Sequence, residues 1–437
     1  MNTPKELRLY GNFVKWLIIA VVSGIVIGAV GAVFHELLGK VTEIRQENSF
    51  LILLLPLGGP LIVLLYRMCG MEKDGGTNSI IKGARGEENV SPVTAPLIIA
   101  ATLITHLLGG SAGREGAALQ LGGSLISPLK KPLKLNNDDY SVLIMCGMAA
   151  GFSSLFGTPV AAAIFAIEVT VVGIVHYSAI VPCIISSVTA AITAAAIGVH
   201  PTAFTVSDIP IFGADSALTA AKVLVMGIAC AAVSVIFCTA ISLCSRFYKR
   251  IIPNAYLRAA AGGAIVAGLS MLIFFLTDSF DYNGAGTHII ENAFSGNARP
   301  EAFLLKIILT ALTLGAGFKG GEIVPTLFTG AVFGCYFGEL IGLSPSFGAA
   351  VGLAGVFCGV TNCPLSTVIL SIELFGTGGL PYYAIAIALS YMLSGYRGLY
   401  SAQKFYDGKL SQTGFKEFRT RSEIKKAKKE DVSDGNN

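Results

Sequence analysis

Charged residues are scarce in this chain, which has 437 residues, 13% of them Asp, Glu, Lys or Arg and 53% hydrophobic. Soluble domains carry about 25% charged residues, so the composition excludes an ordinary soluble protein. There is one tryptophan against 51 glycines, and apolar stretches recur nearly from end to end. These features predict an all-α polytopic membrane protein.

Sequence patterns for disulfides, metal ions and hydrolytic chemistry are also missing. The nine cysteines are odd in number and form no CxxC pair, and the five histidines have no metal-ligand spacing, so we expect no disulfide, metal or cofactor. No HExxH or GxGD pattern occurs. One GxSxG match surrounds Ser111, but it follows an apolar membrane run instead of a strand, so we expect no enzyme activity. The net charge of +4 comes largely from ends and loops and does not predict nucleic-acid binding.

The apolar runs predict a membrane domain over residues 1–400, followed by a short basic tail. The first run, 13–38, is too long for a signal-peptide core and is expected to be a retained helix. Residues 1–15 and the tail 401–437 are basic and are expected to be cytoplasmic, in a bacterial-type inner membrane. Further membrane helices are expected near 50–68, 92–108, 140–155, 159–172, 178–197, 218–244, 255–277, 301–316, 323–343, 346–360, 364–376 and 381–394.

A glycine-rich tract, GGSAGREGAALQLGG at 109–123, interrupts these runs and carries Arg114 and Glu115 side by side. Ionised residues at membrane depth are costly and usually face a transport pathway. The glycines suit a turn and the alanine-rich segment suits a helix, whose unpaired N-terminal amides favour an anion. The alternative is a short interfacial loop.

The two halves of the chain, about 13–198 and 218–400, repeat one another. The segment FSSLFGTPVAAAIFAIE at 152–168 matches FCGVTNCPLSTVILSIE at 357–373, with Phe, Pro, Ile, Ile and Glu coinciding. Gly110, Gly113 and Glu115 likewise match Gly317, Gly320 and Glu322. Two halves that each contain an interrupted glycine-rich segment are typical of transporters whose repeats meet at a midplane site.

Glu115 and Glu322 are therefore the candidates for proton coupling, because each heads a segment of broken helix. Glu168 and Glu373 end the matching helices, where a structural hydrogen bond or an exposed terminus is expected. The hydroxyl of Tyr400 could donate to an anion or could sit at the membrane interface. Three further residues could donate to a pore or cap a short helix at 80–84, namely Thr77, Asn78 and Ser79.

These residues resemble the CLC family of chloride channels and anion/proton exchangers over nearly the whole chain. GREG at 113–116 resembles the family's G[K/R]EGP motif, GEIVP at 321–325 resembles GxFxP, and GGTNS at 75–79 lies where GSGIP is expected. The resemblance implies a homodimer with one anion pathway per subunit, an inverted repeat of tilted and broken helices, and helices 159–168 and 364–373 at the dimer interface. It further implies that Glu115 is the gating glutamate and Tyr400 the central tyrosine of the anion site.

The departures from the family pattern bear on the anion. Gly76 replaces the motif serine, unless the alignment slides to Thr77, and Val169 replaces the internal proton glutamate of the chloride exchangers. Glu322 is an acid that those exchangers lack. The pattern resembles the bacterial fluoride/proton branch most, so fluoride export is expected, with chloride/proton exchange or passive chloride conduction as the alternative. The expected anion-binding residues are Gly76, Thr77, Asn78, Gly113, Arg114, Gly116, Ile323, Val324 and Tyr400.

Overall fold

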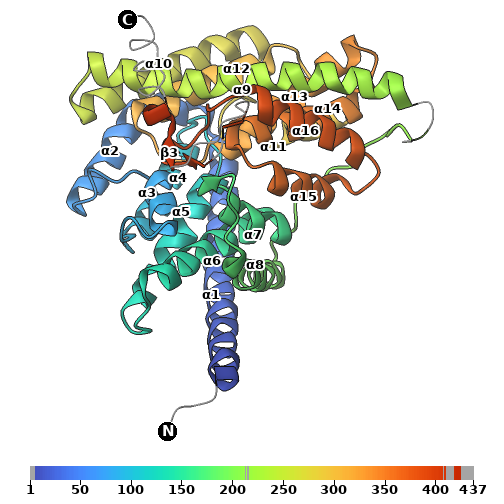
Figure 1. The fold of residues 1–437 in the computed structure, drawn as a ribbon. Coiled ribbons are helices and arrows are strands. Elements are labelled where there is room, and N and C mark those ends of the chain that lie inside the picture. The colour runs from blue at the N-terminus through green and yellow to red at the C-terminus, as the bar shows by residue number, and fades with distance from the viewer. Residues whose placement is uncertain (1–4, 212, 214–215, 407, 410–417, 425–437) are drawn as a thin grey trace, which may run out of the picture.

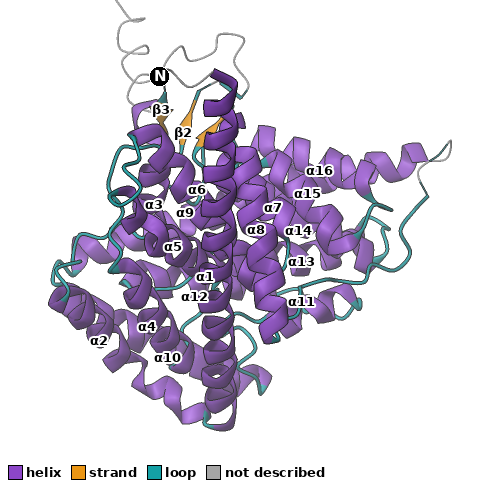
Figure 2. Ribbon diagram, turned by 90° about the horizontal axis from the view of Figure 1, so that it is seen from below, coloured by secondary structure: helices purple, strands orange, loops and turns teal. Residues whose placement is uncertain are grey.

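A computed structural model describes residues 5–211, 213, 216–406, 408–409 and 418–424. The first helix, α1 (Lys5–Glu47), has 43 residues. At 1.5 Å per residue it is about 65 Å long, more than the ~30 Å of a bilayer core requires. It runs the length of the molecule and extends past the other helices at its N-terminal end (Figures 1 and 2).

The remainder of the first half consists of short and medium helices. Their bounds are η1 (Ser49–Leu54), α2 (Leu55–Met68), α3 (Thr77–Ala84), α4 (Thr94–Leu107), α5 (Glu115–Ile126), η2 (Ser127–Lys130), α6 (Asn137–Phe156), α7 (Pro159–Glu168) and α8 (Tyr177–Ile197). A short strand, β1 (Val171–Val172), lies between α7 and α8.

The second half begins with the long helix α9 (Ala217–Ile251), which crosses the top of the view in Figure 1. It continues with α10 (Ala255–Thr277), α11 (Thr287–Phe294), α12 (Ala302–Ala316), α13 (Ile323–Leu340), α14 (Pro345–Thr361), α15 (Pro364–Phe375) and α16 (Leu380–Leu393). Strands β2 (Lys404–Phe405) and β3 (Arg419–Thr420) follow.

Among the described residues, seven helices are long and apolar enough to cross a membrane, and the others are shorter. Short helices arise where the sequence supplies a break. Pro159 and Pro364 begin α7 and α15 at the first helical position, where a proline costs no hydrogen bond. Gly157 and Asn362, which end the preceding helices, both have left-handed backbone.

Within each half, glycines let a pair of neighbouring helices pack closely, and the two pairs correspond to each other. In the first half, Gly122 of α5 lies against the backbone of Gly147 in α6. In the second half, a Cβ on Gly330 of α13 would lie 2.7 Å from the carbonyl oxygen of Gly352 in α14. Helices in membranes associate largely through such close backbone approach. The predicted all-helical inverted repeat is confirmed.

The start of the tail is part of the folded structure. Strand β2 pairs in parallel with β1 and antiparallel with β3, forming a three-stranded sheet at one edge of the helical body (Figure 2). Arg85 fixes it further, since Nη1 donates to the carbonyl oxygens of Thr170 and Ala402 at 3.1 and 2.6 Å. Residues 407, 410–417 and 425–437 of the tail lie outside the described residues.

Three local predictions are corrected by the structure. The first helix begins at Lys5 instead of 13 and ends at Glu47 instead of 38, because polar residues at its ends continue the helix beyond the apolar run. Val171–Val172 form strand β1 and do not extend α7. The short helix expected at 80–84 begins earlier, at Thr77, directly after Gly76.

Candidate functional site

Helices α5 and α13, which hold the two candidate glutamates, begin beside each other. Gly113 and Gly321 form an antiparallel bridge in which each amide donates to the carbonyl oxygen of the other residue at 2.7 Å. The interrupted segments of the two halves thus meet, as the repeat predicts. Since the first amides of an α-helix have no acceptor within the helix, both N-termini direct unpaired N–H groups and positive dipole ends at this junction.

Backbone approach at this junction requires glycine. A Cβ on Gly321 would lie 2.6 Å from the amide nitrogen of Gly116 and 3.1 Å from that of Glu115. A Cβ on Gly116 would lie 2.9 Å from the Cα of Gly321. Any larger residue would separate the helix N-termini. Backbone amides converging on one point are the usual protein arrangement for holding an anion.

Glu115 is the first residue of α5 and is 1% exposed. Its carboxylate turns back onto Arg114, accepting a hydrogen bond from the backbone amide at 3.2 Å and one from Nε at 3.3 Å. The side chain of Arg114 is 18% exposed, and Nη1 lies 3.0 Å from Nδ1 of His35 on α1. A carboxylate held by a helix N-terminus and a guanidinium occupies the kind of position that a free anion would take.

Glu322 immediately precedes α13 and is half-buried. Its Oε2 is buried and has no hydrogen-bond partner among the described residues. The same atom would lie 3.1 Å from a Cβ on Gly116, which places the Glu322 carboxylate against the first turn of α5. The two candidate carboxylates therefore share one junction, although they are 207 positions apart.

Lys319 is the cation of the loop before α13. Its Nζ lies 4.4 Å from the centre of the Tyr66 ring, and Asp74 and Glu322 act on it electrostatically. Lys319 therefore places a positive charge close to Glu322, held on the face of an aromatic ring.

Position 76, where the resemblance predicts an altered anion-binding residue, faces Gln120 of α5. A Cβ on Gly76 would lie 3.5 Å from Oε1 of Gln120. Nε2 of Gln120 donates to the hydroxyl of Thr77 and to the carbonyl of Gly116, at 3.1 and 3.3 Å. Gln120 is 4% exposed and its Oε1 lacks a partner among the described residues. Nothing in the sequence singles out this residue, because only the fold brings it to α3.

Tyr400 is 4% exposed, and its hydroxyl has no hydrogen-bond partner among the described residues. Glu322 and Glu115 are both among the charged groups that act on it. A buried donor close to two carboxylates fits the side of an anion site. Asn78 holds the segment after Tyr400 in place, because its side-chain oxygen accepts from the Ala402 amide at 2.9 Å.

The other predicted anion-binding residues lie on the same junction. Ile323 and Val324 are buried in the first turn of α13, where the Thr326 amide donates to the Glu322 carbonyl at 3.2 Å. They contribute apolar walls and main-chain amides. The nine predicted residues come from the starts of three helices, α3, α5 and α13, and from the segment after α16.

Glu168 and Glu373 have a different environment. Glu168 accepts from the amides of Leu365 and Ser366 at 3.0 and 2.8 Å, in the first turn of α15. Glu373 accepts from the amides of Val160 and Ala161, both at 2.9 Å, in the first turn of α7. Each therefore caps the matching helix of the opposite half, which confirms the expected structural hydrogen bonds.

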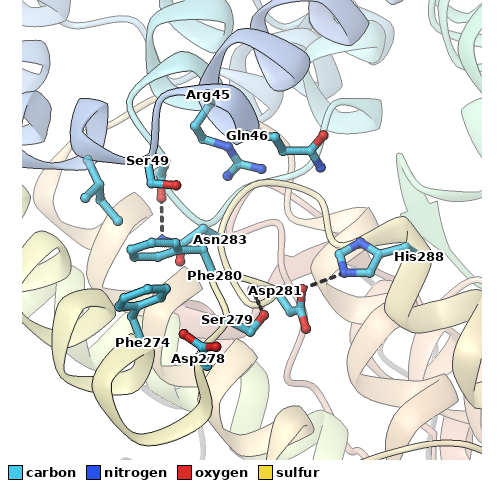
Figure 3. Close-up of a pocket in the computed structure, with 12 residues that line it drawn as sticks. Arg45, Gln46, Ser49, Phe274, Asp278, Ser279, Phe280, Asp281, Asn283 and His288 are labelled. Carbon is cyan, nitrogen blue, oxygen red and sulfur yellow. Dashed lines mark hydrogen bonds and ion pairs between the residues drawn. The ribbon is translucent and has the colours of Figure 1, made fainter.

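A cavity of about 290 Å³ opens beside the loop after α10 (Figure 3). Arg45 and Asn283 line it together with an acidic edge, where His288 donates to Asp281 at 2.9 Å and thereby lowers the pKa of that carboxyl. Buried Lys306, nearby in the fold, donates to the carbonyls of Tyr282 and Gly284 at 3.2 and 2.6 Å. Lys306 thereby stabilises the loop next to the junction.

Two further expectations concern chemistry other than transport. Among the described residues, no group of three or more His, Cys, Asp or Glu could hold a metal ion. Ser111 of the GxSxG match is buried, and its hydroxyl contacts the carbonyl of Tyr282 and the hydroxyl of Thr310, both at 3.1 Å. Neither contact is a base that could activate a nucleophile.

Known proteins resemble this chain in sequence and in fold. The profile of the voltage-gated chloride channel family matches residues 57–395, which include both interrupted segments and all four glutamates. The chain belongs to the CLC family. Proteins that exchange anions against protons are among the relatives of this chain.

Its relatives carry more specific descriptions. A chloride/fluoride channel protein of Pseudomonas syringae pv. tomato is 34% identical over 92% of this chain and 89% of its own length. An H(+)/Cl(-) exchange transporter of Vibrio parahaemolyticus is 26% identical over 82% of this chain and 81% of its own. The crystal structure of a CLC-type fluoride/proton antiporter superposes with a TM-score of 0.85 at 32% identity, covering 91% of this chain and 99% of that one.

Proposed function

We propose that the protein is a fluoride/proton antiporter that exports fluoride, with Glu115 as the gating carboxylate and Glu322 as a second acid of the same site. The observation that carries this proposal is the junction at Gly113 and Gly321. There two carboxylates and two helix N-termini meet, and Oε2 of Glu322 and the hydroxyl of Tyr400 are buried without a partner among the described residues.

In this mechanism the Glu115 carboxylate and the transported anion compete for the N-terminus of α5. While ionised, Glu115 holds the place by its hydrogen bonds to the amide and Nε of Arg114. A proton that binds the carboxylate removes its charge and weakens both hydrogen bonds, so the side chain leaves. An anion then takes the vacated amides. When the proton departs on the other side, the carboxylate returns and displaces the anion, which moves proton and anion in opposite directions.

Three features of the site support fluoride as the anion. Gly76 supplies no hydroxyl where the family motif has serine, and Gln120 lies beside it. Val169, fully buried, stands where chloride/proton exchangers carry an internal proton-transferring glutamate. Glu322 places an acid directly in the anion site instead. The names of the Pseudomonas relative and of the superposed antiporter point the same way.

As the biological unit we propose a homodimer in a bacterial inner membrane, with the basic tail in the cytoplasm. The basic side chains of the tail and of α1's N-terminal end favour the cytoplasmic side. Exposed apolar residues on α7 and α15, Val160 and Leu365, offer surfaces for a second copy. Cross-linking in membranes at these two helices would test the dimer, and a monomeric band alone would reject it.

The function is tested by paired fluoride and proton flux from liposomes that contain the purified protein, with fluoride and chloride in turn. Fluoride efflux that drives proton uptake, with little chloride flux, is the expected result. Chloride is the runner-up, because chloride exchangers are among the relatives. Rapid chloride flux would show that chloride, not fluoride, is the transported anion. The proton trace would then distinguish an exchanger from a channel.

A further inference from the structure

The guanidinium of Arg114 is shared between the candidate gate and a histidine on another helix. Nε donates to Oε1 of Glu115 at 3.3 Å, and Nη1 lies 3.0 Å from Nδ1 of His35. A guanidinium can only donate. Nδ1 of His35 must therefore be the acceptor, so the imidazole is neutral and carries its proton on Nε2. This contact exists only in one protonation state of His35.

His35 lies closer to the surface of the protein than Glu115 does. It lies in α1 and is half-buried, whereas His200, in the connection after α8, is exposed and acts on it electrostatically. The buried Glu115 carboxylate, 1% exposed, has no comparable access. A proton from solution thus reaches the imidazole without passing the gate.

Few other ionisable groups surround this histidine. Helix α8, packed along α1, contains no Asp, Glu, Lys, Arg or His, and the acids of α6 lie in its first turn, at Asp138 and Asp139. On α4, buried His106 bonds to the Thr102 carbonyl through Nδ1 at 2.9 Å. The charged or titratable groups that act on His35 from neighbouring elements are Arg114 from the start of α5 and His200 from the connection after α8. Glu115 reaches it only through the Arg114 guanidinium.

We propose that His35 is a pH-dependent positioning residue of the gate, holding Arg114 on Glu115 while neutral and releasing it when protonated. The inference rests on the proposed function, since it assigns a regulator to the Glu115 gate. A proton on Nδ1 removes the lone pair that accepts from Nη1 and places a positive charge beside the guanidinium. The guanidinium, 18% exposed, then turns toward solvent, and its Nε contact with Glu115 is lost.

The consequence for transport is a faster gate at acid pH. Once Nε has left, the Glu115 carboxylate keeps only backbone donors, the amides of Arg114 and of Glu115 itself. A charge-assisted hydrogen bond near solvent contributes modestly, so we expect exchange to accelerate roughly three- to tenfold through this step. The acceleration adds to the direct protonation of Glu115, which needs no histidine.

Two substitutions at His35 separate its roles as acceptor and as titratable group. In His35→Asn, Oδ1 occupies about the position of Nδ1 and accepts from Arg114 at every pH. In His35→Leu the acceptor is absent at every pH. The matched control is His288→Asn, because His288 also contacts a charged partner, Asp281, but lies in the cavity beside α10.

The experiment measures fluoride–proton exchange by these proteins in liposomes with equal pH on both sides, stepped from about 8 to about 4. The range extends below that of an ordinary histidine because Arg114 and His200 put positive charge beside His35. Equal pH removes any proton gradient and makes the orientation of the protein unimportant. The wild type and H288N should show the acid step. H35N should lose the roughly three- to tenfold share of this step that is due to His35 and keep only the acceleration from direct protonation of Glu115. H35L should be fast already at about pH 8 and show that same smaller acceleration.

An H35N protein that keeps the wild-type acid step would overturn the inference, even if H35L proved too unstable to purify. If the wild type exchanges fluoride for protons and both His35 variants keep its pH profile, this inference fails and the proposed function stands. A wild-type protein that moves fluoride without protons would overturn the proposed function and the inference with it. The wild-type proton trace therefore distinguishes the two failures.

Discussion

Glu168 and Glu373 each accept two backbone hydrogen bonds, of 2.8 to 3.0 Å, from the first turn of a helix in the opposite half. Glu115 instead folds back on the start of its own helix with longer contacts of 3.2 and 3.3 Å, and Oε2 of Glu322 has no partner among the described residues. All four carboxylates are at helix N-termini. One pair is fixed between the halves, and the other is free to exchange partners.

The difference shows how a repeat separates stability from function. Two well-directed amides on each carboxylate stabilise it strongly in one position, so the Glu168 and Glu373 caps hold the halves together. A carboxylate with weaker contacts can be displaced by an anion or a proton at modest cost. The four predictions below test this division, in order of decreasing effect.

The largest effect is expected for Glu115→Gln, which keeps the shape of the side chain but cannot carry a proton. Proton movement should fall about a hundredfold or more, because a positioned acid–base group contributes that much to proton transfer. The measurement is proton uptake by liposomes under a fluoride gradient. Full coupling in this variant would show that Glu115 is not the gate.

Glu322→Ala should reduce fluoride-linked proton transport by roughly tenfold, corresponding to loss of one charged hydrogen-bonding group of the site. Its thermal stability should change little, since Oε2 makes no hydrogen bond among the described residues. Parallel flux and melting measurements check this. A destabilised protein with normal coupling would place Glu322 with the capping pair instead.

Glu168→Ala should lower the stability of the protein and leave its proton coupling unchanged, the opposite of Glu322→Ala. Glu373→Ala should have the same effect. Each leaves two amides of the opposite half without an acceptor, which costs about 1–3 kcal/mol of stability. The ratio of protons to anions should remain that of the wild type. Heat survival in detergent and the flux ratio are the two measurements, and an altered ratio would mean that these caps also move during transport.

The smallest effect concerns Glu87, in the loop after α3. Hydrogen bonds from Arg85 and Lys404 lower the pKa of Glu87 to about 2. A depressed pKa contributes stability above the unfolded value of about 4.3, and that stability is lost as pH falls toward about 2. Glu87→Gln should therefore melt slightly earlier at neutral pH, and the gap from wild type should close on acidification. A gap independent of pH would exclude this ion pair as its cause.

Much of the architecture was predictable from the sequence because membrane helices are long apolar runs and their breaks carry glycine, proline or charge. The tract around Glu115 and its counterpart at Glu322 stand out for that reason. The same signal placed Glu168 and Glu373 only at helix ends. Which pair is capped depends on helices about 200 positions away, and local pattern contains no such information.

Two contacts of the site could not be predicted at all. Gln120 looks like an ordinary residue of an alanine-rich helix, and His35 lies near the end of the first apolar run. Each acquires its partner, Thr77 or Arg114, only when the helices of the first half pack together. The anion-binding roles of Gly76, Thr77, Asn78 and Tyr400 stay predictions, supported by their positions at one junction.

The central claim is that Glu115 and the anion compete for the same helix N-terminus. Calorimetric titration of the purified protein with fluoride, from about pH 8 to about pH 5.5, tests it most directly. The account predicts that fluoride binds more tightly as the pH falls and takes up a proton, and that Glu115→Gln binds tightly at every pH. Wild-type affinity that is independent of pH, with no proton taken up, would contradict it.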